Sequence, residues 1–162
     1  MPAATNTAEE FLKLHVPGTP LIMPNPWDRG TALLLASLGF HALATTSQGH
    51  AFALGRHDGN IARDEALAHG SDIVAATPLP VSADLEGCFA DTPDEVAETI
   101  RLAARAGLAG CSIEDFDGSS FYDRSQAVER VAAAAEVARS VEHRLILTAR
   151  ADGFMRRAYD LD

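Results

Sequence analysis

Short apolar runs and longer alanine-rich runs alternate along the chain. The short runs are rich in β-branched residues, whereas the longer runs repeat apolar residues at intervals of three and four. The first pattern is typical of buried strands and the second of amphipathic helices. Five strands are predicted, over residues 20–25, 42–47, 80–87, 110–115 and 144–152. Strands that alternate with helices in this way predict a parallel sheet of the α/β class.

Capping residues mark the ends of the predicted helices. The clearest helix follows Thr92, with Pro93 at its first position and Glu95 three residues after the cap, and it stops at Gly107. Other helices are predicted to begin at Thr7, after Asp28, at residue 63, and at Asp123 or Ser125. Residues 50–62, with glycines on both sides of a charged centre, are predicted to form a loop. We find no linker, so residues 1–162 are expected to form a single domain.

Charge and composition exclude several classes of protein. The 162 residues carry a formal net charge of −10 and a single lysine, Lys13, so a nucleic-acid partner, which requires clustered basic residues, is not expected. The N-terminus lacks the pattern of a secretion signal, and no apolar run approaches the roughly 18 residues of a membrane span. A cytoplasmic protein without a membrane partner is therefore expected. Cys88 and Cys111 lack C-x-x-C spacing and are expected to fill core space.

Charged residues gather at the predicted C-terminal ends of three strands. In the stretch VSADLEG, residues 81–87, Asp84 and Glu86 are predicted to share one strand face, because side chains alternate along a strand. Glu114 lies near the end of the next strand, and Arg150 near the end of the fifth. Ligand sites of open α/β sheets and of TIM barrels lie at this edge. We therefore expect these four side chains to meet.

Three carboxylates in one place repel one another unless a pKa rises or a cation binds. Because all the donors are oxygen atoms, the expected cation is hard and divalent, Mg²⁺ or Mn²⁺. Arg150 would then bind an anionic group of the ligand. Taken singly, the D-x-E motif is more typical of a helix cap or a solvated loop than of a metal ligand. Glu114 alone is also consistent with loop charge, and Arg150 with a structural ion pair. Their recurrence at equivalent positions of successive βα units favours a shared site.

Five segments in chain order resemble the isocitrate lyase and phosphoenolpyruvate mutase superfamily. They are NPWDRGTALLLASLGFHALATTS (25–47), LGRHDG (54–59), SADLEG (82–87), GCSIED (110–115) and LTARAD (147–152). The resemblance implies a TIM-type (β/α)8 barrel. Since a complete barrel needs about 250 residues, this chain would hold about its first five βα units. It also implies a homo-oligomeric, Mg²⁺-dependent enzyme of carboxylic acid metabolism, a lyase or an isomerase of the mutase type. Such enzymes make or break C–C or P–C bonds in small 2-oxo or enol-pyruvyl acids through an enolate.

The resemblance also implies roles for single residues. Asp84 matches the direct metal ligand, and Glu86 stands where the family usually has a second aspartate. Glu114 matches a ligand that acts through metal-bound water. Asp58 matches a catalytic aspartate that positions the metal's waters and the substrate.

Substrate contacts are implied at two further places. Thr46, Ser47 and Gln48 fall where the family holds the carboxylate of the oxo acid, with main-chain N–H groups and a hydroxyl. Arg150 matches a catalytic arginine that contacts the anionic end of the substrate. On this reading the metal polarises the 2-oxo oxygen and stabilises the developing enolate.

The segment FDGSSFYDRSQA, residues 116–127, departs from the family. Its lyases carry a K-[KR]-C-G-H motif there, but this segment has neither Lys nor Cys, so isocitrate or methylisocitrate cleavage in the usual way is not expected. Tyr122 or Asp123 is left as an acid or base if the loop closes, and His50 or His57 as an aid to proton transfer. Two alternatives stay open: a hydrolase of oxaloacetate or phosphonopyruvate, and a truncated, non-catalytic paralogue that acts in oligomerisation.

Overall fold

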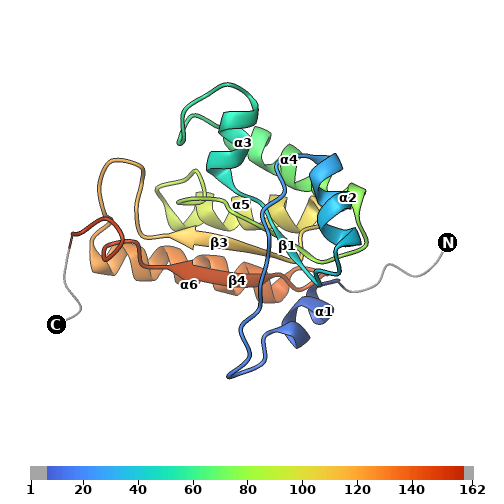
Figure 1. The fold of residues 1–162 in the computed structure, drawn as a ribbon. Helices are drawn as coiled ribbons and strands as arrows, with labels where there is room; N and C mark the ends of the chain where they lie inside the picture. The colour runs from blue at the N-terminus through green and yellow to red at the C-terminus, as the bar shows by residue number, and fades with distance from the viewer. Residues whose placement is uncertain (1–6, 159–162) are drawn as a thin grey trace.

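The computed structural model describes residues 7–158, which form a parallel sheet of four strands flanked by six helices (Figure 1). The strands are β1 (Leu43–Ala44), β2 (Val81–Ala83), β3 (Gly110–Glu114) and β4 (Ile146–Arg150), which pair in chain order. The helices are α1 (Thr7–Leu14), α2 (Arg29–Ser37), α3 (Ser47–Ala53), α4 (Arg63–Ala76), α5 (Pro93–Arg105) and α6 (Arg124–Ser140). This confirms the predicted α/β class, and the arrangement is that of part of a TIM-type barrel.

The prediction of a strand at residues 20–25 is wrong, because the described sheet has four strands rather than five. The segment runs beside β1, where the N–H of Ala44 donates to the carbonyl of Pro24 over 3.1 Å, and the side-chain amide of Asn25 donates to the carbonyl of Ala44. Prolines at positions 20 and 24 lack the N–H that a strand ladder requires. The segment therefore stays extended without becoming a strand.

The strand predicted at residues 42–47 is shorter than expected because a helix begins inside it. The side chain of Thr46 accepts a hydrogen bond from the N–H of Gly49 and so caps α3. This helix also replaces the first residues of the loop predicted at 50–62. Residues 54–62 remain a loop, and α4 begins at Arg63 as predicted.

The predicted caps are confirmed at three helices. Asp28 and Thr31 exchange the reciprocal bonds of a capping box at α2, and Thr92 and Glu95 do the same at α5. Asp123, one of the two residues proposed to start α6, accepts a hydrogen bond from the N–H of Gln126. These ends are local in sequence, which explains why the pattern alone located them.

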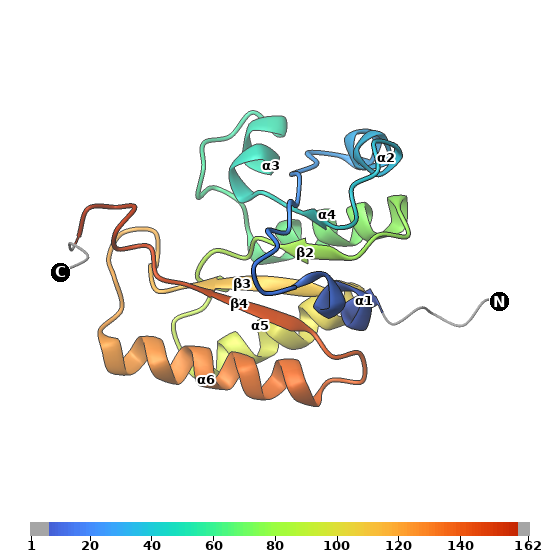
Figure 2. The same cartoon turned by 60° about the horizontal axis from the view of Figure 1, so that its bottom comes forward.

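The two faces of the sheet differ in polarity. Apolar side chains of β2 and β3, such as Val81, Cys111 and Ile113, are buried with α4, α5 and α6 in the main core, and Figure 2 shows α5 and α6 together on one side of β3 and β4. Both cysteines are free and buried, as expected. The alternate residues of β3, Ser112 and Glu114, point away from this core, which leaves polar groups on the other face.

Helix α1 fills the polar face at the N-terminal ends of the strands (Figures 1 and 2). Phe11 is buried there against Ala42 and Ala109. A Cβ added to Gly110 would lie 2.8 Å from the Phe11 ring, so this approach requires glycine. The opposite, C-terminal ends are left for polar side chains. Within residues 7–158, no helix is long and apolar enough to cross a membrane; the cytoplasmic location stays a prediction.

Candidate active site

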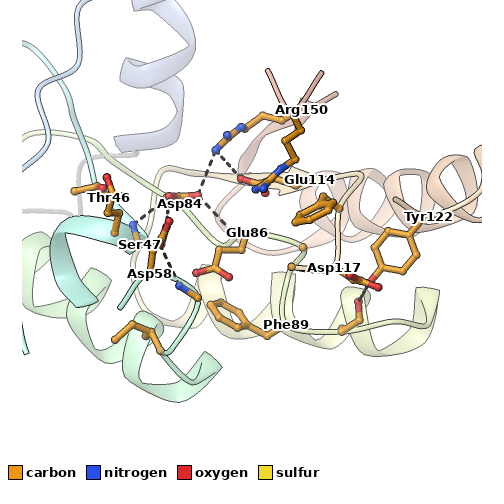
Figure 3. A pocket seen from close by; sticks show the side chains of 18 of the residues that line it. Thr46, Ser47, Asp58, Asp84, Glu86, Phe89, Glu114, Asp117, Tyr122 and Arg150 are labelled. Carbon is orange, nitrogen blue, oxygen red and sulfur yellow. Dashed lines mark hydrogen bonds and ion pairs between the residues drawn. The ribbon is translucent and has the colours of Figure 1, made fainter. Parts of the chain in front are cut away.

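A cavity of about 770 Å³ opens at the C-terminal ends of the strands. The eight residues to which the sequence assigned a metal, catalytic or substrate-binding role all line it: Thr46, Ser47, Gln48, Asp58, Asp84, Glu86, Glu114 and Arg150. Figure 3 shows Ser47 and Asp58 on one side of Asp84, with Glu114 and Arg150 on the other. The structure thus brings together segments that are up to 104 residues apart in the chain.

Asp84 follows directly after β2 and has a partner on each side. Its Oδ2 accepts hydrogen bonds from the N–H of Ser47 over 3.1 Å and from the Ser47 hydroxyl over 2.8 Å. Its Oδ1 accepts from the Ser112 hydroxyl over 3.2 Å and lies 3.6 Å from Nη1 of Arg150. The N–H of Asp84 donates to the hydroxyl of Thr45. Asp84 is therefore fixed by residues from three separate segments: residues 45–47, β3 and β4.

Glu86 reaches the cavity by a different route from the one predicted. Strand β2 ends at Ala83, and Glu86 has a φ of +50°, so strand alternation does not place it. Its Oε1 is buried and has no hydrogen-bond partner among the described residues. Burial, followed by the negative charges of Asp84 and Asp58, raises the pKa of Glu86 to about 7.

Glu114 and Arg150 form the tightest ion pair of the cavity, with 2.7 Å between Oε1 and Nη1. Burial raises the pKa of the Glu114 carboxyl to about 7, although Arg150 acts in the opposite direction. Nη2 of Arg150 also lies 3.3 Å from Oδ2 of the buried Asp152. One guanidinium thus contacts three carboxylates that come from β2, β3 and the end of β4.

The acidic side chains match a hard divalent cation in chemistry but are not gathered around one point. Asp84, Glu86 and Glu114 offer only oxygen donors, and Oε1 of Glu86 is unpaired. Within residues 7–158, however, no three His, Cys, Asp or Glu side chains are arranged so that they hold a metal ion together. The donor set fits Mg²⁺ or Mn²⁺, and its closure around an ion stays a prediction.

Some of the polar groups that were predicted to bind the substrate carboxylate already form hydrogen bonds within the protein. Both the N–H and the hydroxyl of Ser47 bond to Asp84, and the hydroxyl of Thr46 caps α3. Gln48 lines the cavity beside them. Asp58 lies in the exposed 54–62 loop, where its Oδ1 accepts the N–H of Gly59. Ser47 thus orients Asp84 in this structure, and the substrate role of all three polar residues stays a prediction.

Tyr122 and Asp123 were the candidates for an acid or base in segment 116–127. Neither is positioned to act as a base. Asp123 caps α6, and hydrogen bonds from Ser125 and Gln126 lower its pKa. Tyr122 lines the cavity and donates its hydroxyl to Asp91 over 2.8 Å. Burial, with this bond, raises the pKa of Tyr122 to about 12, so the phenol stays protonated at neutral pH.

The two histidines proposed to assist proton transfer also differ in place. The His50 ring stacks on that of His69 at 3.9 Å, away from the main cavity. Burial lowers the pKa of both rings, so the pair is neutral at neutral pH. His57 is exposed in the 54–62 loop and does not line the cavity.

Sequence reasoning missed three charged residues around the site. Arg156 lines the cavity, and its guanidinium lies 3.7 Å from the centre of the Phe116 ring. Asp152 is buried and accepts contacts from both Arg150 and Arg156. Arg130, on α6, is 1% exposed and lies behind the cavity wall. Arg156 and Arg130 lie in no sequence motif. Asp152 lies in the LTARAD segment (147–152), which was the one sequence signal for any of these three residues.

Comparison with known proteins gives consistent results. The family model for phosphoenolpyruvate phosphomutase matches residues 11–162. The 2,3-dimethylmalate lyase of Eubacterium barkeri is 32% identical over 112 residues, which are 68% of this chain and 38% of that enzyme. The chain spans less than half the length of the curated relatives it matches.

Solved structures resemble the chain over nearly its whole length. A candidate lyase/mutase from Burkholderia cenocepacia J2315 is 52% identical, with a TM-score of 0.93 over 98% of this chain and 58% of that one. An oxaloacetate acetylhydrolase is 26% identical, with a TM-score of 0.83 over 94% of this chain and 55% of that one. The relatives thus include both a lyase and an acetylhydrolase by name.

Proposed function

The chain belongs to the phosphoenolpyruvate phosphomutase family, and from this premise we propose a lyase- or mutase-type enzyme for small carboxylic acids. It makes or breaks C–C or P–C bonds in 2-oxo or enol-pyruvyl acids through an enolate. The observation that carries the proposal is the meeting of Asp84, Glu86, Glu114 and Arg150 in one cavity. The names of relatives, among them 2,3-dimethylmalate lyase, support the substrate class.

A divalent cation, Mg²⁺ or Mn²⁺, belongs to this proposal. Asp84, Glu86 and Glu114 would hold it, because they are the oxygen donors that share the cavity. When bound, the cation supplies positive charge for the oxygen that becomes negative in the enolate. Ser47 and Ser112 donate to the two oxygens of Asp84 and keep this carboxylate in one orientation.

Arg150 is the residue that we propose to bind the substrate's carboxylate or phosphoryl group. Its planar guanidinium suits two parallel hydrogen bonds to such a group. It is about one-third exposed, so a ligand reaches it from the cavity. Asp152 is buried and holds one of its nitrogen atoms from behind. Asp58, which is exposed and lines the same cavity, would hold or move a proton there.

A hydrolase is the second candidate. The segment 116–127 has no cysteine or lysine, and Tyr122 and Asp123 are engaged as a hydrogen-bond donor and a helix cap. A reaction that uses water in place of a protein acid suits such a loop. The relative named as an oxaloacetate acetylhydrolase supports this alternative.

Calorimetric titration with Mn²⁺, with and without oxalate as a mimic of the enolate, tests the proposal. We expect Mn²⁺ to bind, and to bind more tightly when oxalate is present. Incubation with 2,3-dimethylmalate, oxaloacetate and phosphonopyruvate, followed by product analysis, then separates the lyase or mutase from the hydrolase. A folded protein that binds no Mn²⁺ under either condition would contradict the metal-dependent enzyme.

A further inference from the structure

Arg130 is a buried cation to which the proposed reaction gives no role. It lies in the middle of α6, and only 1% of its surface is exposed. Nη1 donates to the carbonyl of Glu114 over 3.1 Å, whereas Nη2 donates to the carbonyls of Gly87 and Ala90, the latter over 2.9 Å. The guanidinium also lies 3.7 Å from the centre of the Tyr122 ring. All its hydrogen-bond acceptors are main-chain atoms.

These acceptors lie in two segments that carry the acidic groups. Gly87 and Ala90 belong to the 86–90 loop after β2, and Glu114 ends β3. The N–H of Glu114 also donates to the carbonyl of Glu86 over 2.9 Å. Arg130 therefore holds the main chain on both sides of the main-chain hydrogen bond between Glu114 and Glu86. A guanidinium can bond to several carbonyls at fixed angles, which an ammonium group does less well.

The main-chain conformation of the 86–90 loop requires contacts of this kind. Glu86, Cys88 and Phe89 have φ values of +50°, +60° and +53°, which side-chain-bearing residues adopt only when surrounding contacts hold them. Gly87 comes so close to Phe116 that an added Cβ would lie 2.8 Å from its carbonyl oxygen. Since the Glu86 Oε1 has no hydrogen-bond partner among the described residues, the position of this carboxylate depends on the main chain that carries it and on the packing around it.

We infer that Arg130 is a positioning residue, which holds the 86–90 loop against the end of β3 so that Glu86 and Glu114 face the cavity together. The inference rests on the proposed function in that these two carboxylates bind the cation. Arg130 does not itself line the cavity, and both of its terminal nitrogens, Nη1 and Nη2, donate to main-chain carbonyls.

Mn²⁺ binding by a set of four proteins tests this inference: the unmodified chain, Arg130→Lys, Glu86→Gln and the double variant. Arg139→Lys serves as the control, because Arg139 is exposed on the same helix. We expect Arg130→Lys to remain folded and to weaken Mn²⁺ binding about tenfold, as loss of a supporting contact does in metal sites. In the Glu86→Gln background the same change should have much less effect, since the positioned carboxylate is gone.

Amide hydrogen exchange gives a second measurement that needs no metal. We expect residues 86–90 to exchange at least tenfold faster in Arg130→Lys, while β3 keeps its protection. Unchanged exchange in this loop, or unchanged Mn²⁺ affinity in a folded Arg130→Lys variant, would overturn the inference. Equal losses of affinity with and without Glu86 would overturn it as well. If the unmodified chain binds no Mn²⁺, the proposed function fails, and the exchange experiment alone decides on Arg130.

Discussion

Asp84 and Glu86 are two residues apart, yet the regions around them hold their carboxylates in opposite ways. Asp84 stands at the end of β2 and receives hydrogen bonds from Ser47 and Ser112 in addition to the Arg150 ion pair. Glu86 stands in a loop with a left-handed main chain, and its buried Oε1 has no partner among the described residues. The first carboxylate is fixed by side chains and the second by its main chain.

Because Asp84 and Glu86 are held in different ways, we expect them to respond to different changes. Hydrogen bonds from Ser47 and Ser112 hold the Asp84 carboxylate in one orientation, as supporting contacts do for a metal ligand. Burial without partners disfavours the charged form of Glu86, and its pKa is raised to about 7. We therefore expect side-chain substitutions to act on Asp84, and changes of pH or of the loop's support to act on Glu86.

Replacement of Asp84 should have the largest effect. Asp84→Asn keeps the shape of the side chain but removes the charge, and we expect Mn²⁺ affinity to fall about 100-fold or more, beyond the loss typical of a supporting contact. Any turnover should disappear with it. Calorimetry with Mn²⁺ and oxalate measures the effect, and Asp94→Asn, on an exposed turn of α5, is the control. Normal binding by Asp84→Asn would show that the site is assigned wrongly.

The pH dependence of stability should reveal Glu86 and Glu114. Their pKa values are raised from 4.5 to about 7, so between these values the folded protein binds more protons than the unfolded chain. Their contribution to the free energy of unfolding should therefore fall as the pH rises from 4.5 to 7, by on the order of 2 kcal/mol once solvent exposure is allowed for. Urea unfolding in EDTA at several pH values measures it.

Two comparisons sharpen this experiment. The double variant Glu86→Gln/Glu114→Gln should lose most of the dependence between pH 4.5 and 7. The lowered pKa values of Glu65 and Glu95 act below this range, whereas those of His50 and His69 act in the opposite direction within it. The difference between the unmodified chain and the double variant therefore isolates the two glutamates. The same pH dependence in both metal-free proteins would contradict the raised pKa values.

Loss of the Ser47 hydroxyl should have the smallest effect. Ser47→Ala removes the 2.8 Å bond to Asp84 but keeps the main-chain N–H bond to the same oxygen. One hydrogen bond contributes about 1 kcal/mol, so we expect Mn²⁺ affinity to fall about fivefold. The control is Ser37→Ala, whose hydroxyl bonds only to its own helix. A loss as large as that of Asp84→Asn would mean that Ser47 touches the cation or ligand directly.

Features that depend on residues close together in the chain were predictable from the sequence. The capping boxes at Asp28 and Thr92 are confirmed, and the apolar runs at 80–87, 110–115 and 144–152 contain β2, β3 and β4. All eight predicted site residues line one cavity, because parallel strands present their C-terminal ends at the same edge. The errors, at residues 20–25 and 42–53, arose where missing proline N–H groups and a Thr46 cap overrode the apolar pattern.

The sequence by itself determined the α/β class and the ends of several helices, because local propensity fixes these. Strand order indicated Asp84, Glu86, Glu114 and Arg150 as cavity residues, and the family resemblance added Thr46, Ser47, Gln48 and Asp58. Only the tertiary structure decided how each acid is held. The three carbonyls around Arg130 and the ion pairs of Arg150 with Asp84 and Glu114 all join distant segments. Such contacts depend on packing between elements, which spacing along one chain does not encode.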